Sequence, residues 1–144
     1  MGVTVINNKP PSHFSGPIAV SSDRIQTITA GATLTADDNG SVFVLGDAVP
    51  GTITLPAVAN AGFECKVYCG FAITTNAVVA SAEGDNMEGA MMVASTVVDV
   101  NAADQVNFVA TAENIGDWAS FFSDGTYWYV DGRALTTGAL TATG

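Results

Sequence analysis

Trp118-Ala-Ser-Phe-Phe-Ser-Asp-Gly-Thr-Tyr-Trp-Tyr-Val130 is the stretch of this sequence that decides its fold. Aromatic and β-branched residues, which favour strands, stand on both sides of Asp124-Gly125. Asp-Gly favours the type I′ turn, whose twist matches that of two paired strands. The stretch therefore predicts a β-hairpin with Asp124 and Gly125 as its central turn residues.

This hairpin would present large rings on both of its faces. Its turn pairs Phe122 with Tyr127, and Phe121 with Trp128. Because alternate residues of a strand point to opposite faces, one face would carry Phe121, Trp128 and Val130. The other face would carry Phe122, Tyr127 and Tyr129. A soluble monomer needs only one apolar face, so we expect one set in the core and the other against a second subunit or another partner.

Short strand candidates separated by turn residues recur along the rest of the chain. We expect strands over 23–30, 33–45 with a hairpin across Asn39-Gly40, 51–55, 63–71, 73–80, 90–98, 105–111, 118–123 and 126–131. No segment of a dozen residues keeps helical spacing, although short helical turns around 36–40 or 112–116 stay open. The pattern predicts an all-β fold, a compact antiparallel β-sandwich or barrel of jelly-roll-like type.

The two ends of the chain differ from this pattern. Residues 7–17 hold three of the five prolines, and adjacent prolines favour an extended path. We interpret residues 1–17 as an extended N-terminal arm, with a frayed terminus as the alternative. Residues 18–133 would form a single β domain. Residues 134–144 have little to bury and are expected as a short C-terminal tail.

The charge balance is strongly acidic. Fourteen carboxylates face four basic residues, which gives a net charge of −10. Such a chain repels phosphate backbones, so we expect no nucleic-acid partner, although acidity also serves solubility alone. No run reaches the roughly 18 apolar residues of a membrane helix, so no membrane partner is expected either.

The residues that could carry chemistry form no recognisable constellation. The single histidine, His13, stands among prolines in the expected arm and has no orienting partner there. Cys65 and Cys69 share one face of the strand predicted over 63–71, with about 13 Å between them, beyond disulfide reach. They are expected as buried free thiols. The carboxylates fall in Gly- and Asn-rich turns. We expect no enzyme, no catalytic residues, no metal and no cofactor.

Three segments resemble a pattern of tailed-bacteriophage structural proteins, namely Leu34-Thr-Ala-Asp-Asp-Asn-Gly-Ser-Val-Phe-Val-Leu45, Gly51-Thr-Ile-Thr-Leu-Pro56 and Phe121-Phe-Ser-Asp-Gly-Thr-Tyr-Trp-Tyr-Val-Asp-Gly132. The resemblance covers roughly residues 33–133. It is to head decoration (cement) proteins, and also to small tail-fibre or spike-tip domains. It implies a homotrimer on the outer surface of the capsid. There it would bind the major capsid protein at three-fold sites between capsomers and stabilise the virion.

These expectations assign roles to two groups of residues. The arm would anchor on the capsid shell by β-augmentation, through Val3, Val5, Ile6, Pro10 and Pro11. The aromatic hairpin would serve the core and a subunit interface. The alternative function is a tail-fibre or spike-tip domain in which Phe122, Tyr127 and Tyr129 stack on a host surface glycan.

Overall fold

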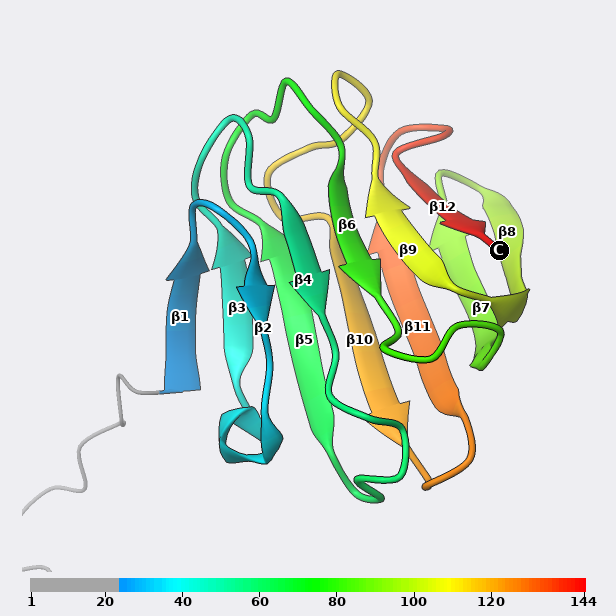
Figure 1. Cartoon of the computed structure of the whole chain (residues 1–144). Helices are drawn as coiled ribbons and strands as arrows, with labels where there is room; N and C mark the ends of the chain where they lie inside the picture. Colours follow the sequence, from blue (N-terminus) through cyan, green and yellow to red (C-terminus); the bar gives the residue numbers. More distant parts are fainter. Residues whose placement is uncertain (1–23) are drawn as a thin grey trace, which may run out of the picture.

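The computed structural model describes residues 24–144, which form two β-sheets packed face to face (Figure 1). Sheet A has seven strands in the order β1 (Ile25–Ile28), β3 (Val42–Leu45), β5 (Glu64–Cys69), β10 (Trp118–Ser123), β11 (Trp128–Ala134), β7 (Met87–Val93) and β8 (Thr96–Ala103). Sheet B has five strands in the order β12 (Leu140–Thr143), β9 (Gln105–Phe108), β6 (Ala77–Ala80), β4 (Thr52–Thr54) and β2 (Ala32–Thr33). The described residues contain no α-helix, and a 3-10 turn covers Ala36–Asp38. The prediction of an all-β, sandwich-like fold is confirmed.

Both sheets are mixed, so the prediction of an antiparallel, jelly-roll-like sandwich is wrong. From β1 to β6 the chain alternates between sheets, with β1, β3 and β5 in sheet A and β2, β4 and β6 in sheet B. Neighbouring strands in each set are parallel. A parallel neighbour requires a crossover connection, and here the strand that lies between two parallel neighbours in the sequence, in the opposite sheet, forms that connection. We call one pass of the chain through both sheets, such as β1 and β2, a coil. Alternating side chains show that a segment is a strand but not in which direction its neighbour runs.

The hairpin expected across Asn39-Gly40 does not form. Gly40 N–H donates to Glu64 O at 2.8 Å, and Glu64 N–H donates to Asn39 Oδ1 at 2.9 Å. The dipeptide therefore binds the neighbouring coil of the chain instead of closing a local hairpin. Just before it, Asp38 accepts the Thr35 N–H at 2.8 Å and stabilises the 3-10 turn. This hydrogen bond lowers the pKa of Asp38.

The chain crosses from sheet A to sheet B at Gly31, between β1 and β2, and again at Gly51, between β3 and β4, and these two crossings pack closely against each other. Gly31 has φ +83°, and a Cβ there would lie 2.8 Å from the backbone oxygen of Thr52. Gly51 occupies the corresponding place one coil later, with φ +78° and a Cβ position 3.1 Å from the nitrogen of Gly31. Both positions combine a left-handed conformation with close backbone approach, and glycine alone fits both conditions without strain.

The second half of the chain is largely antiparallel. The hairpins β7–β8 and β10–β11 both lie in sheet A, and β10 also pairs with β5. The single strand predicted over 90–98 is wrong, because Ala94 (φ 57°) lies in the turn between β7 and β8. Because apolar residues stand on both sides of this turn, the sequence pattern gives no signal that one strand ends and another begins there.

The C-terminal segment also differs from its expectation as a tail. Strand β12 pairs with β9 at the edge of sheet B. Ala139 and Leu140 are both 0% exposed. Four threonines give this segment a polar appearance. Of its two leucines, Leu135 is exposed, whereas alternation along β12 places Leu140 in the core. The domain therefore extends through β12.

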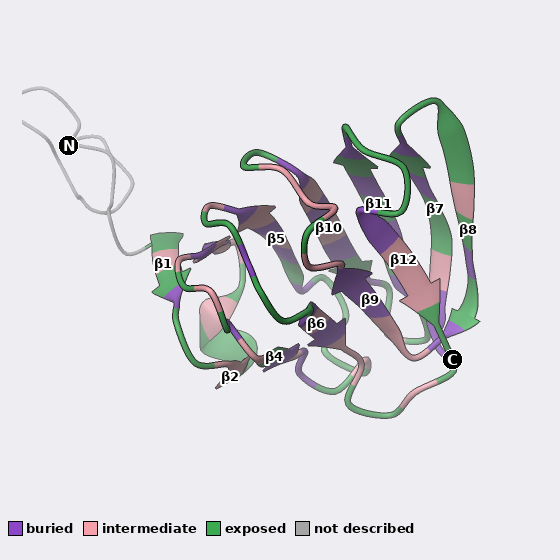
Figure 2. Cartoon of the chain, turned by 90° about the horizontal axis from the view of Figure 1, so that it is seen from above, coloured by how far each residue is buried: buried purple, intermediate pink, exposed green. Residues whose placement is uncertain are grey.

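The core lies between the sheets, where buried residues of both face one another (Figure 2). Its largest fully buried side chains include Phe43, Phe108, Phe121 and Trp128. Each contributes roughly 1.5–3 kcal/mol by leaving water. Phe63 meets Trp128 edge to face at 5.8 Å between ring centroids. Residues 1–17, expected as an arm, lie outside the described residues.

Candidate functional site

The aromatic hairpin forms, with a register that differs from the predicted one. Phe122 pairs with Tyr129 and Phe121 with Val130. Gly125, with φ +98°, and Thr126 are therefore the central turn residues. Because the shift amounts to two residues, every side chain keeps its predicted face.

Asp124 gives the physical reason for this register. Its Oδ1 accepts the N–H groups of Thr126 at 2.8 Å and Tyr127 at 2.9 Å. An aspartate that bonds the backbone two and three residues ahead precedes a turn and is not one of its central residues. Hydrogen bonds from Tyr127 and Thr126 to the carboxylate lower the pKa of Asp124.

One face of the hairpin is in the core and the other is in solvent. Phe121 and Trp128 are 1% and 0% exposed. Three rings on the outer face of sheet A are exposed, and we call them the aromatic trio: Phe122 at 45%, Tyr127 at 42% and Tyr129 at 45%. The division into a core face and an exposed face agrees with the prediction, whereas a partner for the exposed face stays a prediction.

The aromatic trio is ordered by its own contacts. The rings of Phe122 and Tyr129 stack with centroids 6.4 Å apart, and Tyr127 lies 6.5 Å from Tyr129. The Tyr129 hydroxyl donates to Asp124 Oδ2 at 3.0 Å. This hydrogen bond stabilises the protonated phenol and raises the pKa of Tyr129. The trio is a pre-arranged ring surface, which is suited to stacking against a partner.

A second aromatic group lies on the same face, at the opposite end of β10, where its first residue pairs with the end of β5. Tyr68 and Trp118 are cross-strand partners, with ring centroids 6.5 Å apart. The Lys66 ammonium lies 4.5 Å from the Trp118 ring centroid and 5.9 Å from that of Tyr68. These are cation–π distances. On the other side of β10, Trp118 pairs with Arg133 of β11.

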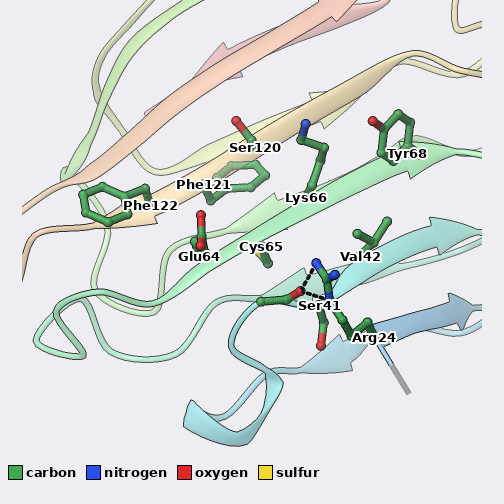
Figure 3. Close-up of a pocket in the computed structure, with 11 residues that line it drawn as sticks. Arg24, Ser41, Val42, Glu64, Cys65, Lys66, Tyr68, Ser120, Phe121 and Phe122 are labelled. Carbon is green, nitrogen blue, oxygen red and sulfur yellow. Dashed lines mark hydrogen bonds between the residues drawn. The ribbon is translucent and has the colours of Figure 1, made fainter. Parts of the chain in front are cut away.

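Between these groups the outer face of sheet A is hollowed by an open depression of about 320 Å³. Its lining includes charged, hydroxyl and aromatic side chains: Arg24, Glu64, Lys66, Tyr68, Ser120 and Phe122. Figure 3 shows Lys66 between Ser120 and Tyr68, and Arg24 beside Ser41. The Arg24 guanidinium donates to Gly40 O at 3.2 Å from one of its nitrogens, which fixes its position. The depression offers ring faces together with hydrogen-bond donors and acceptors.

The outer face of sheet B has the opposite character. None of its five strands contains an acidic or basic residue, although the chain as a whole carries −10. Outward-pointing positions hold small or amide side chains, including Thr52, Thr54, Val78, Asn107 and Thr141. We call this surface the uncharged face.

Polar groups of the uncharged face bind one another. Gln105 Nε2 donates to Asn107 Oδ1 at 2.8 Å, and Asn107 Nδ2 donates to Thr141 Oγ1 at 3.2 Å. Asn107 is only 6% exposed. A polar group that already has its partners loses little when another surface covers it. The uncharged face can therefore be buried at low desolvation cost.

The metal-ligating and thiol side chains of the described residues are spread apart or buried. No group of three or more His, Cys, Asp or Glu side chains within 24–144 could hold a metal ion. Cys65 and Cys69 are free and buried, as predicted. Burial raises the pKa of Cys65 to about 12 and also raises the pKa of Cys69. Both thiols are protonated at neutral pH, and the thiolate is the nucleophilic form. His13 lies outside the described residues.

The other sequence-predicted site residues fall outside the structure, and several surface residues were missed. The arm residues Val3, Val5, Ile6, Pro10 and Pro11 lie outside residues 24–144. Lys66, Tyr68 and Trp118 were not among the predicted site residues. For Lys66 and Tyr68 a signal existed, because they alternate with the apolar face of the cysteine strand and must point outward.

Comparison with known proteins assigns no family to this chain, since no family model and no curated protein matches it. Among residues 24–144, no helix is long and apolar enough to cross a membrane. A proposal for function therefore depends on the two outer faces of the sandwich.

Proposed function

We propose that this protein is a non-enzymatic structural protein of a bacteriophage virion. In this proposal it decorates the outer surface of the capsid as a homotrimer, binds the major capsid protein at three-fold sites between capsomers and stabilises the shell. The observation that carries the proposal is the uncharged face, which gives a strongly acidic chain one broad surface suited to protein contacts.

Electrostatics favour this face as the contact between subunits. Copies that each carry −10 repel one another, and the repulsion is strongest where carboxylates approach closely. Sheet A carries Glu64, Glu88, Asp99 and Asp131 on its strands, whereas sheet B carries none. Contact through the uncharged face keeps the carboxylates of neighbouring subunits apart. The acidic remainder suits the outside of a head, away from packaged DNA.

The capsid contact is assigned to the N-terminal arm. It carries the apolar residues Val3, Val5 and Ile6, and Pro10-Pro11 favours an extended path. Such a segment can add a strand to an exposed sheet edge of a capsid subunit. Three arms on one trimer would engage together, so modest single contacts would combine into firm attachment.

Copy number per particle tests the decoration role. Quantitative mass spectrometry of purified virions should find this protein at the same order as the major capsid protein. A handful of copies per particle would move it to the tail, and its absence from virions would end the proposal.

Native mass spectrometry of the purified protein tests the subunit contact. Val78→Asp places a carboxylate on the uncharged face and should convert trimers to monomers. Ser120→Asp is the matched control, since it adds the same charge on the outer face of sheet A, and it should stay trimeric. A wild-type monomer, or a trimer that survives Val78→Asp with unchanged stability, would refute this assignment of the interface.

The second candidate function is a tail-fibre or spike-tip domain that binds a host surface glycan. The exposed and pre-arranged aromatic trio favours it, because ring faces bind the apolar faces of sugars. Saturable binding of a host polysaccharide, lost in Tyr127→Ala and Tyr129→Ala, would support this function. No binding across a broad panel of glycans would count against it.

A further inference from the structure

We propose that the depression on the outer face of sheet A binds a saccharide that carries a carboxylate, such as a uronic acid residue of an acidic polysaccharide. This inference rests on the second candidate function, glycan binding, and names the class of sugar. It needs neither the trimer nor the capsid contact.

The charge of the depression is opposite to that of the whole chain. Arg24 and Lys66 line the depression with one carboxylate, Glu64, so these three side chains sum to +1 where the whole chain sums to −10. Half of the four basic residues of the chain meet in this one place. At physiological salt the Debye length is about 8 Å, so a bound carboxylate would be attracted by these nearby cations while more distant carboxylates are screened.

Both cations of the depression are held in position by other groups of the protein. The Lys66 ammonium lies over the Trp118 ring at 4.5 Å, and the Arg24 guanidinium is tied to Gly40 O by bonds of 3.2 and 3.3 Å. Lysine has three donors and arginine five, so these contacts leave donors for a ligand. A cation fixed in advance loses little side-chain freedom on binding.

The other lining groups of the depression suit a sugar better than an acidic peptide. Phe122, with 45% of its surface exposed, gives the depression a ring face for stacking. The Ser120 hydroxyl and the Glu64 carboxylate can accept hydrogen bonds from sugar hydroxyls. An acidic peptide would bring several carboxylates against Glu64, whereas a uronic acid residue brings one carboxylate together with hydroxyl groups. A volume of about 320 Å³ is at the small end of ligand sites, and its openness to solvent suits one residue of a longer chain.

The test uses the full-length protein and two probes, trigalacturonic acid, whose carboxylates are ionised, and its methyl ester, whose ester groups are neutral. Isothermal titration calorimetry at 0.15 M salt should give at least tenfold tighter binding of the acid, because only the acid places an anionic acceptor against the cationic donors. Lys66→Gln should weaken binding of the acid about tenfold and leave the ester nearly unchanged. Phe122→Ala should weaken both probes. Arg133→Gln is the matched control: it removes one positive charge outside the depression and should keep the wild-type affinity.

Three results would overturn the proposal. The first is equal affinity of the wild-type protein for acid and ester, a comparison that needs no variant to fold. The second is binding of neither probe at millimolar concentration. The third is a Lys66-dependent affinity for a poly-glutamate peptide that matches the affinity for trigalacturonic acid. Failure here is distinguishable from failure of glycan binding itself: equal affinity for acid and ester would leave glycan binding standing and remove only the carboxylate preference, whereas glycan binding as such fails only if no member of the glycan panel binds.

Discussion

Gly31→Ala probes the parallel coiling of the chain, the feature of the fold that sequence patterning did not reveal. The new Cβ would lie 2.8 Å from the Thr52 backbone oxygen and 3.2 Å from the Thr52 nitrogen. These are backbone atoms of the next coil, so they cannot turn away as a flexible side chain could. Gly138→Ala is a matched control, since Gly138 has nearly the same φ (+82°, against +83°) and no atom within 4 Å of its Cβ position.

The magnitude follows from two contributions. A left-handed φ costs an L-residue about 1–2 kcal/mol, and alanine recovers about 0.4–1 kcal/mol by restricting the unfolded chain. Gly138→Ala should therefore destabilise by about 1 kcal/mol. Gly31→Ala carries the same contribution plus overpacking of about 1–3 kcal/mol, for a total of about 2–4 kcal/mol.

Urea unfolding followed by circular dichroism measures both variants. With a slope of about 2 kcal/mol per molar urea, Gly31→Ala should lower the midpoint by about 1–2 M and Gly138→Ala by about 0.5 M. All samples need one protein concentration, because oligomerisation raises apparent stability. Equal losses in the two variants would show that Gly31 does not pack against Thr52, and the parallel β1–β2–β3–β4 coil would be refuted with it.

Three further predictions concern other parts of the domain. Leu140→Ala should lower the free energy of unfolding by about 2–5 kcal/mol, as for a core leucine, while Leu135→Ala (70% exposed) should change it by less than about 0.5 kcal/mol; equal small effects in urea titrations would return β12 to the status of a tail. Cys65 has a pKa raised from 9.0 to about 12, so the unfolded chain loses this proton first. The part of the free energy of unfolding that depends on this protonated thiol is complete below pH 9 and is lost between pH 9 and 12, about 4 kcal/mol in all at about 1.4 kcal/mol per pH unit. The free energy of unfolding of Cys65→Ala, measured as a function of pH, should lack this loss, and the same pH dependence in wild type and variant would contradict the burial of the thiol. Asp124→Asn should bring the raised pKa of Tyr129 back toward its ordinary value, as measured by NMR titration of the ring; an unchanged titration would mean that the carboxylate does not bind the hydroxyl in solution.

Local patterning was sufficient for much of the strand content. Alternation located the cysteine strand β5 and predicted that its thiols are buried and unpaired. Large apolar residues around Asp124-Gly125 predicted the hairpin, and the two faces were assigned correctly although the register was off by two. A two-residue error is invisible to side-chain facing, because the period of a strand is two.

Errors arose where a distant partner decides the structure. The Asn39-Gly40 turn was predicted as a hairpin because its local preference is strong, yet its hydrogen bonds go to Glu64 in the next coil. Residues 134–144 were predicted as a tail because two leucines among four threonines are a weak signal, and Leu140 is buried because β12 pairs with β9. The same holds for the candidate site, since Arg24, Lys66 and Phe122 are far apart in sequence and meet only on the assembled sheet.

The sequence by itself determined that this protein is built of short strands with an aromatic hairpin, buried free thiols and a large excess of negative charge. These properties depend on residue type and on spacing of a few positions, which local sterics and hydrophobic alternation control. Only the tertiary structure decided which strands are neighbours, that they run parallel in the first half, and that all charged strand residues lie in sheet A and none in sheet B. The physical reason is that strand pairing satisfies backbone groups with partners tens of residues away. The sequence pattern of one strand carries no record of which partner will be there.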